Sequence, residues 1–193
     1  DLGALAQVLA VGHRQLEQLD VGPVLEPVED LQAGGAVLAV CAGFQLIGTQ
    51  LPGADGRMVA GLGLVDAWTL YDQRPRSVGE VVVRSHEHPD QVWTGFENHQ
   101  GVTRIGPTMT PLGHVLRGVG NGLDDGDGWQ RVEGVHHGAV FGTYLHGPVL
   151  ARNPELADEV LRAAVGPLEP FIDELADQLA QERRATLWGG AAS

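Results

Sequence analysis

The chain has 193 residues, of which 43% are apolar, so it can bury the core of one domain. Its formal net charge of −13, from 12 Lys plus Arg against 25 Asp plus Glu, argues against nucleic acid or an anionic membrane as a partner, because both need a basic surface. The longest strongly apolar run, 36–41, is too short to span a bilayer, so we expect no transmembrane segment.

The chain contains one cysteine, Cys41, which cannot form an internal disulfide. This usage fits a reducing compartment, so we expect a cytoplasmic protein. Cysteine and histidine do not occur at zinc-binding spacing, and we therefore predict no metal site.

In chain order, leucines at roughly helical spacing predict a first helix over 2–19. Segment 24–31 is predicted to be a short helix or an extended link. The continuous apolar run 36–40 is typical of a strand buried on both faces of a parallel sheet. A second helix is expected over 44–51, because Pro52 and Gly53 end the pattern there.

The middle of the chain is typical of short strands separated by glycine and proline. We predict strands at 78–83, 92–96, 102–105 and 115–116. An exposed turn is expected at 121–128.

The last third begins with a predicted hairpin, whose strands 132–136 and 139–144 flank His137 and Gly138. A helix over 154–165 follows, with Asn153 as N-cap and Pro154 in the first turn. A further helical stretch is predicted over 168–187.

Together these elements predict an α/β fold with a mostly parallel central sheet and helices on both faces. We expect a single domain over 1–193, in which 167–193 forms a C-terminal helical tail.

Cys41 lies where the buried strand meets a helix, flanked by the small residues Ala39, Ala42 and Gly43. Such a sharp strand–helix turn is the setting of a nucleophile elbow. Amide groups at the helix start favour the thiolate and can bind an oxyanion. The alternative interpretation is a buried structural cysteine, since free cysteine is among the most buried residue types.

His146 follows a predicted strand, and Gly147 and Pro148 then turn the chain. A histidine at a strand end can reach a thiol and act as its general base. Most of the eight histidines are expected to be structural, and His136 and His137 lie in the predicted hairpin turn instead.

Several blocks of sequence resemble the class I (triad-type) glutamine amidotransferases. They are Val40-Cys41-Ala42-Gly43-Phe44-Gln45, Phe96-Glu97-Asn98-His99, Thr143-Tyr144-Leu145-His146-Gly147-Pro148 and Asn153-Pro154-Glu155-Leu156-Ala157-Asp158. The resemblance covers about 34–166. Within that class it points to the cobyric-acid-synthase-like branch and, in that branch, to the glutaminase subunits of lipid II isoglutaminyl synthases. It implies a flavodoxin-like fold.

The resemblance implies roles for particular residues. Cys41 would attack the side-chain amide of L-glutamine, and His146 would act as general base and acid. The Ala42 N–H would bind the oxyanion, Gln45 would lie near the glutamine pocket, and Arg76 would bind the substrate carboxylate, for which an arginine fork is suited.

Asn98 and His99 belong to a motif typical of the subfamily, without an assigned chemical role; side chains that cap a turn are the alternative. The alternative interpretation of Arg76 is a charge in a solvated loop. Arg74 is the competing candidate for the arginine that binds the carboxylate.

Three departures from the family pattern stand out. Ala39 replaces the usual glycine two residues before the cysteine. Pro148 takes the place of the glutamate that orients the histidine in most triad amidotransferases, so an acidic residue of a partner would complete the triad or a Cys-His dyad would suffice. No Gly-Gly-Gly-Glu-Asp-type segment precedes Cys41, and we expect that the sequence lacks the first strands of the fold.

The resemblance implies a glutaminase that supplies ammonia to a Mur-ligase-like (MurT-like) synthetase in a heterodimer. That partner would amidate D-glutamate of lipid II to D-isoglutamine in peptidoglycan synthesis. A phosphate-binding Gly-x-x-x-x-Gly-Lys-Ser/Thr loop is missing from the sequence, so no cofactor is expected in this chain, and ATP and Mg²⁺ would bind the partner.

Three alternatives remain open. The acceptor could be a corrin of the cobyric-acid type. The domain could also be an inactive binding module, or a Cys hydrolase of related fold.

Overall fold

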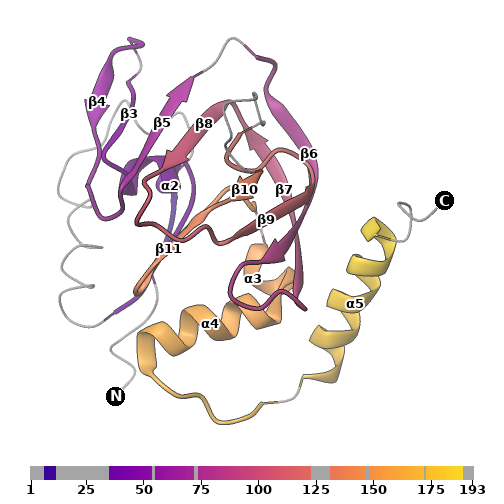
Figure 1. Ribbon diagram of the computed structural model, residues 1–193. Coiled ribbons are helices and arrows are strands. Elements are labelled where there is room, and N and C mark those ends of the chain that lie inside the picture. The colour runs from indigo at the N-terminus through magenta and orange to yellow at the C-terminus, as the bar shows by residue number, and fades with distance from the viewer. Residues whose placement is uncertain are drawn as a thin grey trace.

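The computed structural model describes residues 7–11, 35–53, 55–71, 74–122, 131–146, 148–171 and 173–188 (Figure 1). The described strands form three sheets of four strands each. Helix α4 lies along one side of the sheets, and α5 lies on the side of the molecule where the C-terminus is found (Figure 1).

The first sheet contains the predicted buried strand and is called here the nucleophile sheet. Its order is β1 (Gln7–Val11), β2 (Val37–Cys41), β12 (Val140–Thr143) and β11 (Val135–His137). Strands β1 and β12 both pair with β2 in parallel, whereas β11 and β12 form an antiparallel hairpin. The parallel sheet is therefore as predicted. The hairpin is also present, but the strand predicted over 132–136 is divided at Gly134, because Val132–Glu133 pairs in another sheet and Val135–His137 pairs with β12.

The other two sheets are largely antiparallel. One has the order β10 (Val132–Glu133), β9 (Gly113–Arg117), β6 (Ser77–Ser85) and β7 (Val92–His99). The other has the order β4 (Met58–Ala60), β3 (Gln50–Pro52), β5 (Ala67–Tyr71) and β8 (Gly101–Ile105). The four short strands predicted for the middle of the chain are confirmed as β6, β7, β8 and β9, each with longer bounds.

Helices cover both faces of the nucleophile sheet. On one face, Val37 and Ala39 pack in a cluster with Phe44 and Ile47 of α2 (Ala42–Ile47). On the other face, residues of β2 pack in a cluster that includes both Val149 of α3 (Val149–Arg152) and Leu156 and Val160 of α4 (Pro154–Val165). The alternating side chains of one buried strand thus join two cores, and the predicted α/β class is confirmed.

The predicted helix over 2–19 is wrong at 7–11, where the chain forms β1. Gln7 to Val11 pairs in register with the buried strand β2. A short apolar run satisfies helical and strand patterns alike, and pairing with β2 decides between them here. The rest of that prediction, and the one for 24–31, lie outside the described residues.

Two further boundaries need correction. Helix α2 ends at Ile47, and Gln50–Pro52 is a strand rather than the end of a helix over 44–51. Helix α5 (Glu174–Trp188) begins six residues after the start of the predicted stretch, where Asp173 Oδ1 accepts hydrogen bonds from the N–H groups of Leu175 and Ala176 at 3.1 and 3.0 Å.

Two local predictions also change. Asn121, expected in an exposed turn, is buried and exchanges hydrogen bonds with the Gly134 backbone at 3.0 and 2.7 Å. Residues 123–128 of that turn lie outside the described part of the chain. Asn153 stands at the N-cap position of α4, but its side chain bonds to the backbone of Thr94 and Val149 instead of capping the helix.

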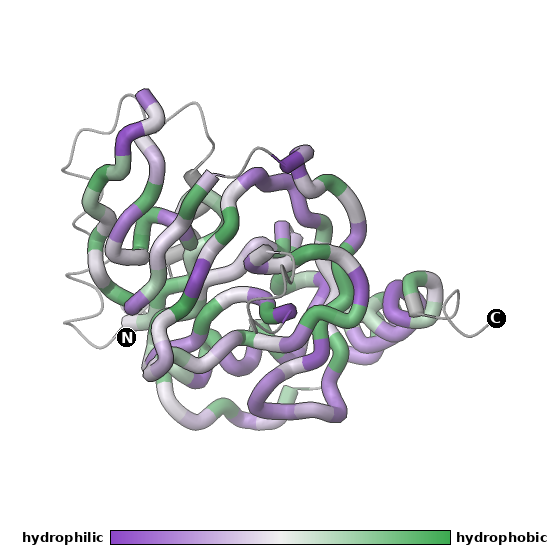
Figure 2. The backbone as a smooth tube through the Cα atoms, turned by 45° about the horizontal axis from the view of Figure 1, so that its top comes forward, coloured by the Kyte–Doolittle hydropathy of each residue, from purple (hydrophilic) through white to green (hydrophobic). Residues whose placement is uncertain are grey.

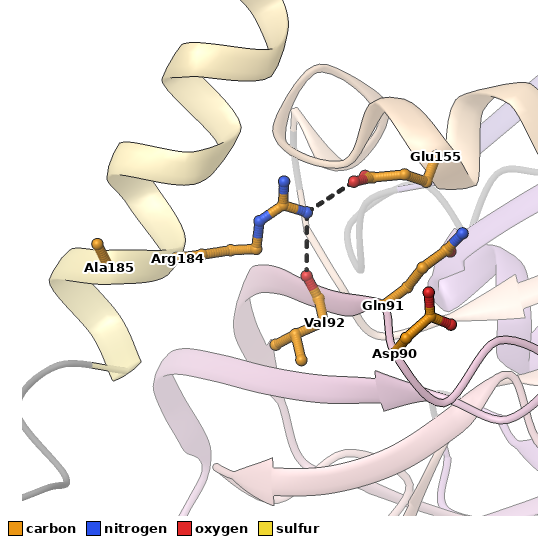
Figure 3. A pocket seen from close by; sticks show the side chains of 6 residues that line it. All are labelled: Asp90, Gln91, Val92, Glu155, Arg184 and Ala185. Atoms are coloured by element: carbon orange, nitrogen blue, oxygen red, sulfur yellow. Dashed lines mark hydrogen bonds and ion pairs between the residues drawn. The ribbon is translucent and has the colours of Figure 1, made fainter.

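Helix α5 attaches to the body mainly through charged groups. Arg184 of α5 donates to Glu155 at 2.9 Å and to the Val92 carbonyl at 3.4 Å (Figure 3). The side chains in Figure 3 border a cavity of about 550 Å³ between α5 and the end of the β6–β7 turn. Hydrophobic stretches run through the body, whereas α5 mixes hydrophilic and hydrophobic residues (Figure 2). Within the described ranges no helix has the length and apolarity needed to cross a membrane.

Candidate active site

Cys41 stands at the junction of β2 and α2 in a strained backbone conformation. Its φ of 55° and ψ of −109° make it the one non-glycine residue with positive φ in the part of the chain that the structure describes. Such strain costs about 1–3 kcal/mol and is found mainly at functional sites. The predicted nucleophile-elbow geometry is therefore present at this cysteine.

The surroundings of the thiol act on its acidity in opposite directions. Burial raises the pKa of Cys41, whereas a hydrogen bond from the Ala42 N–H and the positive charge of Arg76 lower it. Burial is the largest effect, and the pKa ends above its ordinary value. The resting thiol is therefore protonated at neutral pH, and chemistry at this sulfur requires a base.

His146 follows β12 and is oriented by backbone carbonyl groups. Its ring Nδ1 lies 3.1 Å from the Phe96 carbonyl oxygen and 3.1 Å from that of Tyr144. Carbonyl oxygens only accept hydrogen bonds, so the proton of the neutral ring is on Nδ1 and the lone pair is on Nε2. The two carbonyls thus give the orientation that glutamate supplies in most triad amidotransferases, where this chain has Pro148.

The charge state of His146 suits a general base. Burial, with smaller contributions from His99 and Arg76, lowers its pKa, and the two carbonyl contacts only partly oppose that effect. The imidazole is therefore neutral at physiological pH and can accept a proton at Nε2.

The topology brings the two residues to one edge of the nucleophile sheet. Strands β2 and β12 are adjacent and parallel, with Val40 opposite Thr143. Cys41 directly follows Val40, and His146 lies three residues after Thr143. The carboxyl ends of parallel strands share an edge, and the charge of Arg76 acts on both residues.

Arg76 precedes β6 and is held by Asn98 of the adjacent strand β7. Its Nε donates to Asn98 Oδ1 at 2.5 Å, and its Nη2 donates to the Asn98 carbonyl at 2.9 Å. The guanidinium is exposed, and its charge acts on Cys41, His146 and Tyr71. Asn98, which had no role from sequence, therefore orients the predicted carboxylate-binding arginine.

The profile of the CobB/CobQ-like glutamine amidotransferase domain matches residues 25–154. The chain belongs to this family. It is 37% identical over 159 residues to "Lipid II isoglutaminyl synthase (glutamine-hydrolyzing) subunit GatD" of Streptococcus pneumoniae (strain ATCC BAA-255 / R6), covering 79% of this chain and 59% of that protein. It is 35% identical over 165 residues to the protein of the same name from Staphylococcus aureus (strain N315), covering 83% and 62%.

The chain therefore spans about three fifths of the length of these curated relatives. A solved structure described as a glutamine amidotransferase matches with a TM-score of 0.50 at 21% identity, over 73% of this chain and 66% of that one. That likeness supports the amidotransferase fold.

Within the amidotransferase domain, Gln45 lies beneath the surface rather than in an open pocket. It is 4% exposed, and its Nε2 donates to the Tyr144 hydroxyl at 3.1 Å. That hydroxyl is also 2.6 Å from Thr103 Oγ1. A Cβ at Gly101 would lie 2.5 Å from Gln45 Nε2, so only glycine fits beside this network. The structure thus shows Gln45 in a buried polar network, and glutamine binding by it stays a prediction.

His99 is buried in the same region. Its Nδ1 contacts the Gly101 carbonyl at 3.0 Å, and its ring stacks on Tyr144 with 3.8 Å between centroids. The capping of a turn, which was the alternative interpretation, is thus part of its role.

Three residues near the site were missed from sequence. Tyr71 ends β5, and the charge of Cys41 contributes to raising its pKa, after burial. Tyr144 was quoted within the histidine block without a role, and it connects Gln45, Thr103 and His99. Glu133 is fully buried beside Thr143 and Tyr144. A glutamate in a two-residue strand gives no sequence signal of such burial.

Proposed function

We propose that this chain hydrolyses L-glutamine to glutamate and ammonia, with Cys41 as nucleophile and His146 as general base and acid. The observation that carries the proposal is the strained Cys41 at the end of β2, with the lone pair of His146 Nε2 available at the same sheet edge. Membership of an amidotransferase family supports glutamine as substrate.

The first half of the reaction would form a thioester. His146 Nε2 takes the thiol proton as Cys41 Sγ attacks the side-chain amide carbon of glutamine. The Ala42 N–H, which bonds to the sulfur and lies at the start of α2, would bind the developing oxyanion. Collapse of the tetrahedral species breaks the carbon–nitrogen bond, and His146 returns the proton to the leaving nitrogen, so ammonia departs.

The second half would release glutamate. His146 takes a proton from water, which attacks the thioester carbon, and the Cys41 sulfur leaves and is reprotonated. Arg76 would bind the substrate α-carboxylate, while its hydrogen bonds to Asn98 fix the direction of the guanidinium. Because the backbone orients His146, we propose that the dyad is competent and that a carboxylate from a partner would increase its rate.

We further propose that the ammonia serves a Mur-ligase-like synthetase, which amidates D-glutamate of lipid II in the cytoplasm. The names of the two curated relatives support this acceptor over a corrin. The synthetase would bind ATP and Mg²⁺ and form a heterodimer with this chain.

Ammonia release from L-glutamine tests the proposal, with the chain alone and with a co-expressed Mur-ligase-like partner. Cys41→Ser and Ser77→Ala, a substitution beside Arg76, are the paired variants. We expect release that Cys41→Ser abolishes and Ser77→Ala retains, with stimulation by the partner. Folded protein that releases no ammonia in either mixture would contradict the glutaminase and favour a binding module.

A further inference from the structure

Glu133 of β10 is a fully buried carboxylate next to the segment that carries His146. Its Oε1 accepts a hydrogen bond from the Tyr144 N–H at 2.6 Å and another from the Thr143 hydroxyl at 2.9 Å. The same hydroxyl oxygen accepts from the Leu145 N–H at 3.0 Å. One carboxylate thus holds three consecutive residues, two directly and the third through Thr143.

Residues 144 and 145 lie beyond the end of the sheet. Strand β12 ends at Thr143, and the next ladder contact is the isolated bridge between Phe96 and His146. In a sheet, a neighbouring strand would satisfy the N–H groups of residues 144 and 145. Here the side chains of Glu133 and Thr143 take that place, as buried backbone donors require.

The chain of contacts then reaches the imidazole. The Tyr144 carbonyl is one of the two acceptors for His146 Nδ1. Glu133 therefore bonds to one side of Tyr144, and His146 bonds to the other. We infer that Glu133 is a positioning residue, which fixes the backbone of 143–145 and thereby the direction in which His146 presents Nε2. This inference rests on the proposed role of His146 as base.

The electrostatic setting supports a role for the carboxylate that an amide would not reproduce. Glu97 of β7 is the titratable group whose charge acts on Glu133 in the described structure, whereas Tyr144 contacts Glu133 through its backbone N–H. Burial, followed by the smaller repulsion from Glu97, raises the pKa of Glu133 to about 7, against the lowering effect of its hydrogen bonds. Its Oε2 has no hydrogen-bond partner among the described residues. Above neutral pH the ionised form accepts stronger, charge-assisted bonds.

Glu133→Gln tests the inference, because it keeps an acceptor oxygen and the side-chain volume but removes the charge. Glu155→Gln, which removes the partly exposed ion pair between Glu155 of α4 and Arg184 of α5, is the matched control. The His146 ring would be followed by ¹⁵N NMR from pH 5 to 9 in the full chain, with its signals assigned through His146→Gln. Thermal unfolding identifies any variant that fails to fold, and kcat and KM for glutamine are measured in parallel.

We expect folded Glu133→Gln to change the tautomer ratio and the pKa of His146, and to lower kcat about tenfold with little change in KM, since charged acceptors bind more strongly than neutral ones. Glu155→Gln leaves these signals unchanged. Folded Glu133→Gln with His146 signals and a pH profile like those of the wild type would overturn the inference. If no variant hydrolyses glutamine, the proposed function fails, but the ring signals still decide the positioning role.

Discussion

The end of β2 and helix α5 are attached to the molecule in opposite ways. Around Cys41, both faces of the strand are buried in apolar clusters, and hydrogen-bonded polar groups lie beneath the site. Of the described side chains of α5, Ala180 is the buried one, and Leu175 and Leu179 are 65% and 55% exposed. The proposed chemistry, which needs fixed geometry, would thus take place where packing is dense, whereas the polar helix α5 lies on the outside of the molecule.

The cavity described above does not lie at the proposed active site. This cavity of about 550 Å³ lies beside α5, and neither Cys41 nor His146 is among the described residues that line it. Catalysis depends on the placement of reacting groups and not on the volume of a cavity, so this space does not mark the proposed active site.

The largest effect is expected at His146. Substitution His146→Gln removes the proton acceptor, so kcat for glutamine hydrolysis should fall by roughly 10²–10⁴-fold, the usual contribution of general acid–base catalysis. Steady-state ammonia release measures this, with His137→Gln in the exposed hairpin turn as control. Equal losses in both variants would contradict the assignment.

Glu133 should make stability depend on pH. Its pKa is about 7 in the folded chain against 4.5 as its ordinary value, so the unfolded chain loses its proton first as pH rises. Relative to Glu133→Gln, the wild type should lose roughly 3 kcal/mol of unfolding free energy between pH 4.5 and 7, at 1.36 kcal/mol per pH unit. Stability is greatest below pH 4.5 for this group, and urea unfolding across that range checks the sign. A constant difference between the two proteins would show that the carboxyl titrates normally.

Arg76 should affect binding more than the chemical step. Arg76→Ala is expected to raise KM for glutamine by about 10- to 100-fold, the effect of losing a hydrogen-bonded charge partner, with a smaller change in kcat. Asn98→Ala should shift KM in the same direction by less, because the guanidinium stays but loses its orientation. Arg74→Ala is the neighbouring control, and a larger KM effect there than at Arg76 would reassign the carboxylate site.

The smallest effect is expected at α5. Arg184→Ala removes a partly exposed ion pair with Glu155, so the unfolding free energy should fall by less than about 1 kcal/mol. Glutamine hydrolysis should be unchanged, as measured by the same ammonia assay. A loss of activity comparable to that of Arg76→Ala would mean that α5 supports the site, and the contrast between the two regions would be wrong.

The sequence predicted the parts of the fold that local pattern determines. The apolar run 36–40 is typical of a buried strand, and the hairpin around Gly138 and the helix after Pro154 carry strong local signals. Segment 7–11 was predicted wrongly because its state depends on pairing with β2, a contact 30 residues away along the chain. Two antiparallel sheets were not foreseen for the same reason, since strand pairing is a long-range property.

The candidate site shows the same division. Cys41 and His146 were recognisable because their neighbours form family blocks, and the structure brings both to one sheet edge. The orientation of His146 by backbone carbonyls has no side-chain signature, so Pro148 suggested a missing acid. Likewise, the bond between Asn98 and Arg76 joins residues 22 positions apart, and no spacing rule predicts it.

Labelling of Cys41 by an electrophilic glutamine analogue, a diazoketone, tests the central claim most directly. Mass spectrometry of the full chain should find the adduct on Cys41, with protection by excess L-glutamine and none by D-glutamate. His146→Gln should slow labelling, whereas Arg184→Ala should not. Folded protein that shows no adduct at Cys41, or an adduct that glutamine does not prevent, would contradict a glutamine-binding site built around this thiol.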